Sequence, residues 1–210
     1  MGPPQQQAHG PWWDGGMDAR PSPASLDLYW IPLGAGDPLP IVRWNGRLYE
    51  AVDARRQHRP ACAIYHAALE VVADRTRYVI EMAPAWRGDA QDRGAVVEGP
   101  VGTRWLGRSR YFRYEVRRWR DGVIPDQQHA VGGAQRLVAE PHTSRRVLSL
   151  VEEFPAATWG RDEQHLGDMW NSNSLIAWLL ARAGLDMASV RPPVGGRAPG
   201  WAAGLAASSR

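Results

Sequence analysis

The spacing of apolar residues changes once along this chain. Up to residue 119 the apolar residues alternate with a period of two, and beyond residue 143 they recur with a period of about 3.6. The first period is typical of half-buried strands and the second of amphipathic helices. Strands that follow one another through short turns pair antiparallel. The pattern therefore predicts an α+β fold, with an antiparallel sheet packed against a few helices.

Strands are expected where apolar runs are bounded by turn residues. The pair Asn45-Gly46 between two apolar runs predicts a hairpin, because both residues tolerate positive φ. Residues 111–119 alternate most regularly, so one side of this strand should be buried and the other solvated. The buried side is Phe112, Tyr114 and Val116, and the solvated side is Arg113, Glu115 and Arg117. The other expected strands are residues 26–33, 62–72, 77–82 and 95–101.

His66 lies in the middle of the 62–72 strand, which the segment 73–76 joins to the 77–82 strand. If this hairpin closes through an even-numbered loop, Glu81 falls diagonally across from His66 on the same face. A three-residue loop would place the two on opposite faces. The alternative role of His66 is that of a hydrogen-bonded core residue, since buried polar groups find partners without any catalytic role.

Two helices are expected in the second half of the chain. Thr143 or Ser144 caps the first, which ends before Pro155. The second is residues 171–183, with Asn171 as N-cap and Gly184 as the C-terminal stop. From residue 191 onwards Pro and Gly are frequent, so an irregular tail anchored by Trp201 is expected.

Composition predicts a single α+β domain at residues 26–205 behind a disordered leader at residues 1–25, which is rich in Pro, Gly and Gln. The leader lacks the basic start and apolar run of a secretory signal, and the apolar helical stretch 175–183 is about half the roughly 20 residues of a membrane span. A cytoplasmic location without a transmembrane segment is therefore expected. The single cysteine, Cys62, excludes an intrachain disulfide.

All 25 basic residues are arginine, which indicates a high-GC bacterial genome and weakens the inference that each arginine grips phosphate. Residues 104–120 interleave arginine with aromatic residues, a pattern of nucleic-acid or anionic surfaces but also of a solvated strand face. We expect the solvated face, and nucleic acid as an unlikely partner.

An acidic cluster precedes the 171–183 helix without any recognised metal spacing, so a solvated loop and no metal or cofactor are expected. The cluster is Asp162, Glu163, His165 and Asp168.

Ser172 occupies the first turn of the 171–183 helix and lies three, four and seven residues before Leu175, Ile176 and Leu179. At helical spacing it shares their inward face. A helix N-terminus stabilises a developing anion through its N–H groups and its dipole, which suits a nucleophile. The alternative is that Asn-Ser-Asn-Ser only caps the helix.

The order of these motifs resembles a known family. Tyr65-His66 on a strand, the run 78–81 and Asn171-Ser172-Asn173-Ser174 opening a helix look like the circularly permuted papain-like group, related to NlpC/P60 and lecithin:retinol acyltransferase proteins. They are most similar to an uncharacterised bacterial domain family with an Asn-Ser-Asn-Ser/Thr motif. The resemblance covers about residues 61–201, and Ser172 replaces the cysteine expected at the nucleophile position.

The resemblance implies an acyl (amide or ester) hydrolase or transferase, in which Ser172 attacks a carbonyl, His66 takes its proton and Glu81 orients the imidazole. N–H groups near Asn173 would hold the oxyanion. The first alternative is a non-catalytic binding module of the same fold for a small molecule, a peptide, a lipid or a cell-wall fragment; the second is an arginine-rich nucleic-acid or anionic-surface binder. The expected binding residues are Asn171, Asn173, Trp170 and Trp178, of which the two tryptophans form either an apolar ligand wall or core.

Overall fold

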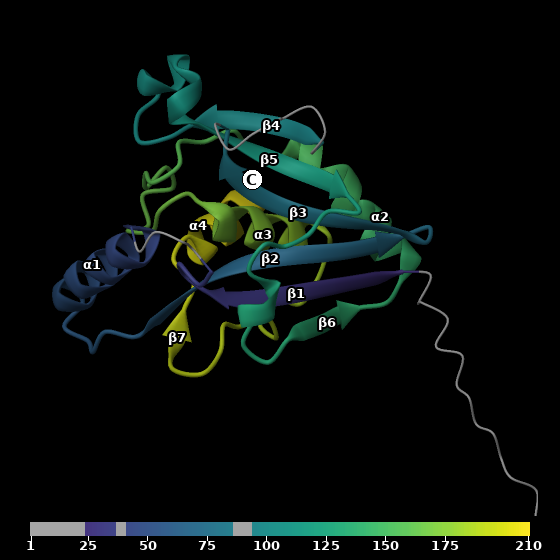
Figure 1. The fold of residues 1–210 in the computed structure, drawn as a ribbon, viewed down its shortest axis with the longest axis horizontal. Helices are drawn as coiled ribbons and strands as arrows, with labels where there is room; N and C mark the ends of the chain where they lie inside the picture. Colours follow the sequence, from purple (N-terminus) through teal and green to yellow (C-terminus); the bar gives the residue numbers. More distant parts are fainter. Residues whose placement is uncertain (1–23, 37–40, 86–93) are drawn as a thin grey trace, which may run out of the picture.

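The computed structural model describes residues 24–36, 41–85 and 94–210, and within them the protein is an α+β fold (Figure 1). The predicted fold class, an antiparallel sheet packed against a few helices, is confirmed. The expected leader lies outside the described residues except for Ala24 and Ser25, and Ser25 already belongs to the first strand. No helix of the described ranges is long and apolar enough to cross a membrane.

The sheet has the strand order β4-β5-β3-β2-β1-β6, in which all neighbours pair antiparallel. A short strand, β7, pairs parallel with the start of β2 at Ala63 and Ile64. The strands are β1 (Ser25–Pro32), β2 (Ala63–Ala73), β3 (Thr76–Pro84), β4 (Ala95–Pro100), β5 (Arg113–Arg120), β6 (Ala134–Val138) and β7 (Gly196–Arg197). All five long runs expected as strands form strands, whereas β6 and β7 were not expected.

The β2–β3 hairpin closes through a two-residue turn. Ala73 pairs with Thr76, and both turn residues, Asp74 and Arg75, have positive φ, of 51° and 63°. The even-numbered loop is thus confirmed, and strand alternation assigns His66 and Glu81 to the same face. Pairing of the two strands ends at Leu69 and Ile80, however, so they separate before they reach either residue.

The predicted hairpin at Asn45-Gly46 is wrong, because residues 41–56 form the helix α1 (Ile41–Arg56). Local turn preference is overridden here by tertiary contacts. A Cβ atom at Gly46 would lie 2.5 Å from Leu33 Cδ2, so the helix backbone packs closely on the end of β1. One turn later the buried carboxylate of Glu50 accepts hydrogen bonds from Arg59, beyond the helix. Both contacts are long-range information that a turn motif does not contain.

The remaining helices are α2 (Pro141–Leu150), α3 (Ser172–Arg182) and α4 (Trp201–Ser208), and the 3₁₀ turns are η2 (Leu106–Arg108), η3 (Arg110–Phe112), η4 (Gln127–His129) and η5 (Val151–Glu153). The expected cap of α2 is wrong: Glu140 is its N-cap, and Ser144 lies buried within the helix, where its hydroxyl donates to Ser25 O. The tail is also helical at α4, although Trp201 does anchor it against Trp30, with ring centroids 5.1 Å apart.

Helices α2, α3 and α4 pack on one face of the sheet and enclose the main core (Figure 1). The opposite face carries a small apolar cluster of Tyr29, Ile31, Ala68, Val79 and Ile124. The same face holds side chains that were expected in solvent: Arg117 is 1% exposed and Glu115 is 2% exposed. The solvated-side prediction is therefore wrong for Glu115 and Arg117, whose charges neutralise each other with Nε 3.1 Å from Oε2. The buried-side prediction is wrong for Phe112, which is 43% exposed.

Candidate functional site at the N-terminus of α3

The start of α3 is fixed by its own polar residues. Asn171 is the N-cap, as predicted, and its side chain accepts hydrogen bonds from the N–H groups of Asn173 and Ser174. Ser174 Oγ in turn accepts from the Asn171 N–H at 3.1 Å, which completes a capping box. Two of the N–H groups that a helix leaves unpaired at its start are therefore satisfied within the motif.

Asn173 ties the helix to the sheet where β2 and β3 have separated. Its Oδ1 accepts from the Ala67 N–H at 2.7 Å, and its Nδ2 donates to Tyr65 O at 3.0 Å. The side-chain amide therefore replaces a neighbouring strand along the edge of β2 that flanks His66. Because these backbone groups are buried, leaving them unpaired would be costly.

Residues 199–200 hold the other side of the motif. The carbonyl oxygen of Pro199 accepts from Asn171 Nδ2 and Asn173 Nδ2, and the Gly200 carbonyl accepts from Ser174 Oγ at 2.8 Å. Gly200 has a φ of 91°, and a Cβ atom there would lie 2.1 Å from Asn171 Oδ1. Glycine is thus required both by the backbone conformation and by the close approach.

Ser172 is the only member of Asn-Ser-Asn-Ser that this framework does not use. Within residues 24–36, 41–85 and 94–210, neither its hydroxyl nor its backbone N–H forms a hydrogen bond. Ser172 therefore does not cap its own helix, because Asn171 and Ser174 make the cap. Ser172 is half-buried and borders a pocket.

This pocket has a volume of about 330 Å³ and lies between the start of α3, the start of β2 and the helix α1. It brings together four residues that the sequence indicated, namely His66, Asn171, Ser172 and Asn173. The rest of its wall is mostly apolar, which suits a ligand with a hydrocarbon part. That wall consists of Leu33, Gly46, Tyr49, Ile64, Tyr65, Trp159, Met169 and Pro199.

Tyr49 is a pocket residue that sequence analysis missed, because it was assigned to a hairpin strand. Burial, followed by the negative charge of Asp53, raises the pKa of the Tyr49 phenol above its usual value. The phenol therefore stays protonated and can donate a hydrogen bond at neutral pH. Trp159 and Met169 were missed as well, since both come from loops whose path no local pattern predicts.

Three of the expected site residues do not line this pocket. Trp170 is fully buried and stacks on Phe154, with ring centroids 4.9 Å apart, and Trp178 meets the same ring edge-on at 5.6 Å. The tryptophans therefore belong to the core under α3. Glu81 accepts a hydrogen bond from Arg117 Nη1 at 3.2 Å, which places its carboxylate in the buried ion cluster of β5.

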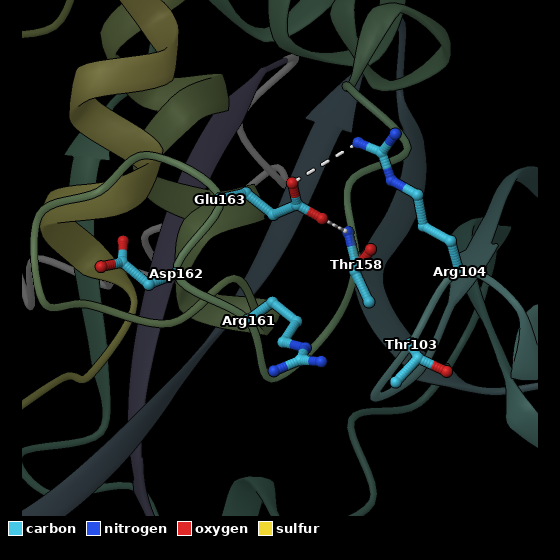
Figure 2. Close-up of a pocket in the computed structure, with 6 residues that line it drawn as sticks. All are labelled: Thr103, Arg104, Thr158, Arg161, Asp162 and Glu163. Carbon is cyan, nitrogen blue, oxygen red and sulfur yellow. Dashed lines mark hydrogen bonds and ion pairs between the residues drawn. The ribbon is translucent and has the colours of Figure 1, made fainter.

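A second hollow, of about 410 Å³, lies over the loop 158–163 (Figure 2). Its charged side chains are already engaged. Glu163 accepts from the Thr158 N–H at 2.9 Å and faces Arg104 at 3.6 Å, and Arg161 Nε donates to Gly102 O. Because it offers no unengaged nucleophile, base or apolar wall, we assign the candidate site to the Ser172 pocket.

The acidic cluster before α3 acts through backbone contacts. Asp162 accepts from the N–H groups of Leu166 and Gly167, and Asp168 accepts from Gly200, Ala202 and Ala203 at the start of α4. Asp168 thus stabilises the positive end of that helix. Among the described residues, no three His, Cys, Asp or Glu side chains gather as metal ligands would.

No protein-family model, no curated protein and no solved structure matches this chain. The role of the pocket is therefore inferred from its own residues.

Proposed function

We propose that the pocket beside α3 binds a compound with an apolar acyl group, and that Ser172 and His66 transfer this group, so that the chain is an acyl hydrolase or transferase. One observation carries the proposal. Three residues of the motif are used to fix the helix start. The fourth, Ser172, forms no hydrogen bond with its hydroxyl or its N–H among the described residues, and it borders a pocket that His66 also lines. This is the arrangement expected for a positioned nucleophile beside a base.

The reaction follows from these positions. Ser172 Oγ attacks the carbonyl carbon of an ester or amide while its proton passes to the His66 imidazole. The leaving alcohol or amine takes that proton when the tetrahedral intermediate collapses to an acyl-serine. Water or another acceptor then releases the acyl group, again with its proton moving through His66.

The oxyanion would be held by the Ser172 N–H. N–H groups near Asn173 were the expected donors, but those of Asn173 and Ser174 already donate to Asn171. The Ser172 N–H has no acceptor among the described residues, and it lies at the positive end of α3. The proposal needs no third residue, so Glu81 remains the partner of Arg117.

A fluorophosphonate probe tests the assignment, because it labels only an activated serine. We expect labelling at Ser172, identified by peptide mass spectrometry, together with hydrolysis of p-nitrophenyl esters. Ser172→Ala should abolish both, and His66→Ala should slow ester hydrolysis by about 10²-fold or more. Ser189→Ala, at an exposed serine outside the pocket, is the matched control. Equal labelling of the Ser172→Ala variant would overturn the proposal.

A second candidate is a binding module that uses the same pocket without catalysis. It is favoured by the absence of a Ser172–His66 hydrogen bond in the described structure, and by the engagement of Glu81 with Arg117. It predicts that a fatty acid or an acylated peptide raises the melting temperature equally in the wild type and in Ser172→Ala, with no probe labelling in either.

A cytoplasmic location, with which the free Cys62 thiol agrees, is part of both proposals.

A further inference from the structure

The helix α1 carries three large apolar side chains on its exposed side. Trp44 is 68% exposed, Leu48 is 66% exposed and Val52 is 43% exposed. Their spacing of four residues places them in one stripe along the helix. A surface helix of a globular domain normally turns such a stripe towards the core.

The inward side of α1 carries two acidic residues. Glu50 is 3% exposed and, with Asp53, binds the guanidinium groups of Arg59 and Arg197. These two residues are the only acidic ones in the helix, so both of its carboxylates are already paired with arginine on the inward side. The outward side then presents the stripe together with the exposed arginines Arg47, Arg55 and Arg56.

A second surface with the same composition lies in residues 104–112. Trp105 is 72% exposed, Tyr111 is 69% exposed and Phe112 is 43% exposed. The exposed arginines Arg108 and Arg110 lie between them, and no acidic residue occurs from residue 99 to residue 114. In Figure 1 this segment, in teal, projects from the same end of the molecule as α1.

We infer that α1 and residues 104–112 dock this end of the protein onto an anionic membrane surface. An apolar helical stripe flanked by arginine is suited to lie in the headgroup region, with its side chains in the acyl boundary. Aromatic residues with one polar edge favour the same interface. Nucleic acid fits less well, because Leu48 and Val52 offer no ring on which bases could stack.

The inference does not depend on catalysis by Ser172. It does place the pocket on the other side of the docked helix, because Gly46 and Tyr49 of α1 line the pocket. A lipid acyl chain that leaves the bilayer would then reach the pocket along the helix that contacts the membrane.

Co-sedimentation with vesicles tests this inference. The full chain should bind vesicles of phosphatidylcholine with 30 mol% phosphatidylglycerol, and binding should weaken with added salt. Arg47→Gln/Arg55→Gln should lower the partition coefficient by about 25-fold, at roughly fivefold for each arginine near the surface. Trp44→Ala/Leu48→Ala should lower it by about tenfold or more through the loss of inserted apolar surface.

The matched controls lie elsewhere on the surface. Arg75→Gln/Arg120→Gln removes the same charge; Arg75 lies at the tip of the β2–β3 hairpin, at the other end of the sheet from α1 (Figure 1). Val123→Ala trims an apolar side chain that is 58% exposed. Both controls should bind as the wild type does. Loss of binding in the controls, or no binding of the wild type to anionic vesicles, would overturn the inference. So would sedimentation that shows a dimer with the stripe buried in its interface, or protection of the stripe by a bound oligonucleotide.

Discussion

The side-chain amide of Asn173 pairs with the backbone of Ala67 as a neighbouring strand would, its Oδ1 lying 2.7 Å from the Ala67 N. This contact occurs just beyond the point where β3 leaves β2. It satisfies a buried backbone donor and at the same time fixes where α3 begins. The position of Ser172, one residue earlier, is therefore set by a hydrogen bond that its neighbour makes to the sheet.

Replacing Asn173 should destabilise the protein much more than replacing Ser172. Asn173→Ala leaves the Ala67 N–H and the Tyr65 carbonyl buried without a partner, and each such group costs about 1–3 kcal/mol. We expect a loss of about 2–4 kcal/mol in the free energy of unfolding, measured with urea. Ser172→Ala, which removes no hydrogen bond within the described chain, should change it by less than about 0.5 kcal/mol. Similar losses in both variants would contradict this account of the motif.

Gly200 should not tolerate a side chain. Gly200→Ala adds a Cβ atom 2.1 Å from Asn171 Oδ1 at a φ of 91°, so both the strain and the displaced cap lower stability. We expect a loss of about 3 kcal/mol or more in urea unfolding. Gly167→Ala is the matched control, because Gly167 also has positive φ but open space around it. Its loss should stay near 1 kcal/mol, the cost of the backbone conformation alone.

Arg117 should be required for stability as a buried cation. Arg117→Met leaves Glu81 and Glu115 without their counter-charge, and breaking a buried ion pair in this way costs about 3–5 kcal/mol. Arg120→Met, on the same strand but 72% exposed, should cost less than about 0.5 kcal/mol. Thermal unfolding of the two variants gives the comparison. An unchanged melting temperature for Arg117→Met would show that the cluster carries no net stability.

Acid should weaken the attachment of α1. Hydrogen bonding from Arg59 lowers the pKa of Glu50 from 4.5 to about 2. Because the folded-state pKa lies below the unfolded one, the stabilisation is complete above about pH 4.5 and is lost as the pH falls towards 2. It is on the order of 3 kcal/mol.

The Glu50→Gln variant isolates this contribution. It should be less stable than the wild type at pH 7, and its stability should fall less steeply between pH 4.5 and pH 2, as urea unfolding at each pH would record. Glu98→Gln is the control, because the Glu98–Arg113 pair is exposed and contributes at most about 1 kcal/mol. Parallel pH profiles for the wild type and Glu50→Gln would count against the role of this carboxylate.

Local patterns predicted much of the site. The cap at Asn171 and the stop at Gly184 depend on residues close together in sequence. The turn parity that puts His66 and Glu81 on one face was one of two alternatives that the sequence left open, and the Ala73–Thr76 pairing decides it. Nothing local indicated Tyr49 or Trp159, because their places depend on where a helix and a loop pack. The departure of Glu81 from the pocket likewise follows from Arg117, a partner 36 residues away.

The sequence by itself determined the α+β class, the strands up to β5 and the start of α3, because period and capping act over a few residues. Tertiary structure alone decided that residues 41–56 are a helix, that residues 201–208 are a helix and that Arg117 is buried. In each case a local conformational preference of about 1 kcal/mol is outweighed by the free energy gained from tertiary contacts. The ion pair of Glu50 with Arg197, the backbone contacts of Asp168 to α4 and the ion pair of Arg117 with Glu81 each join distant segments, and only the folded chain brings them together.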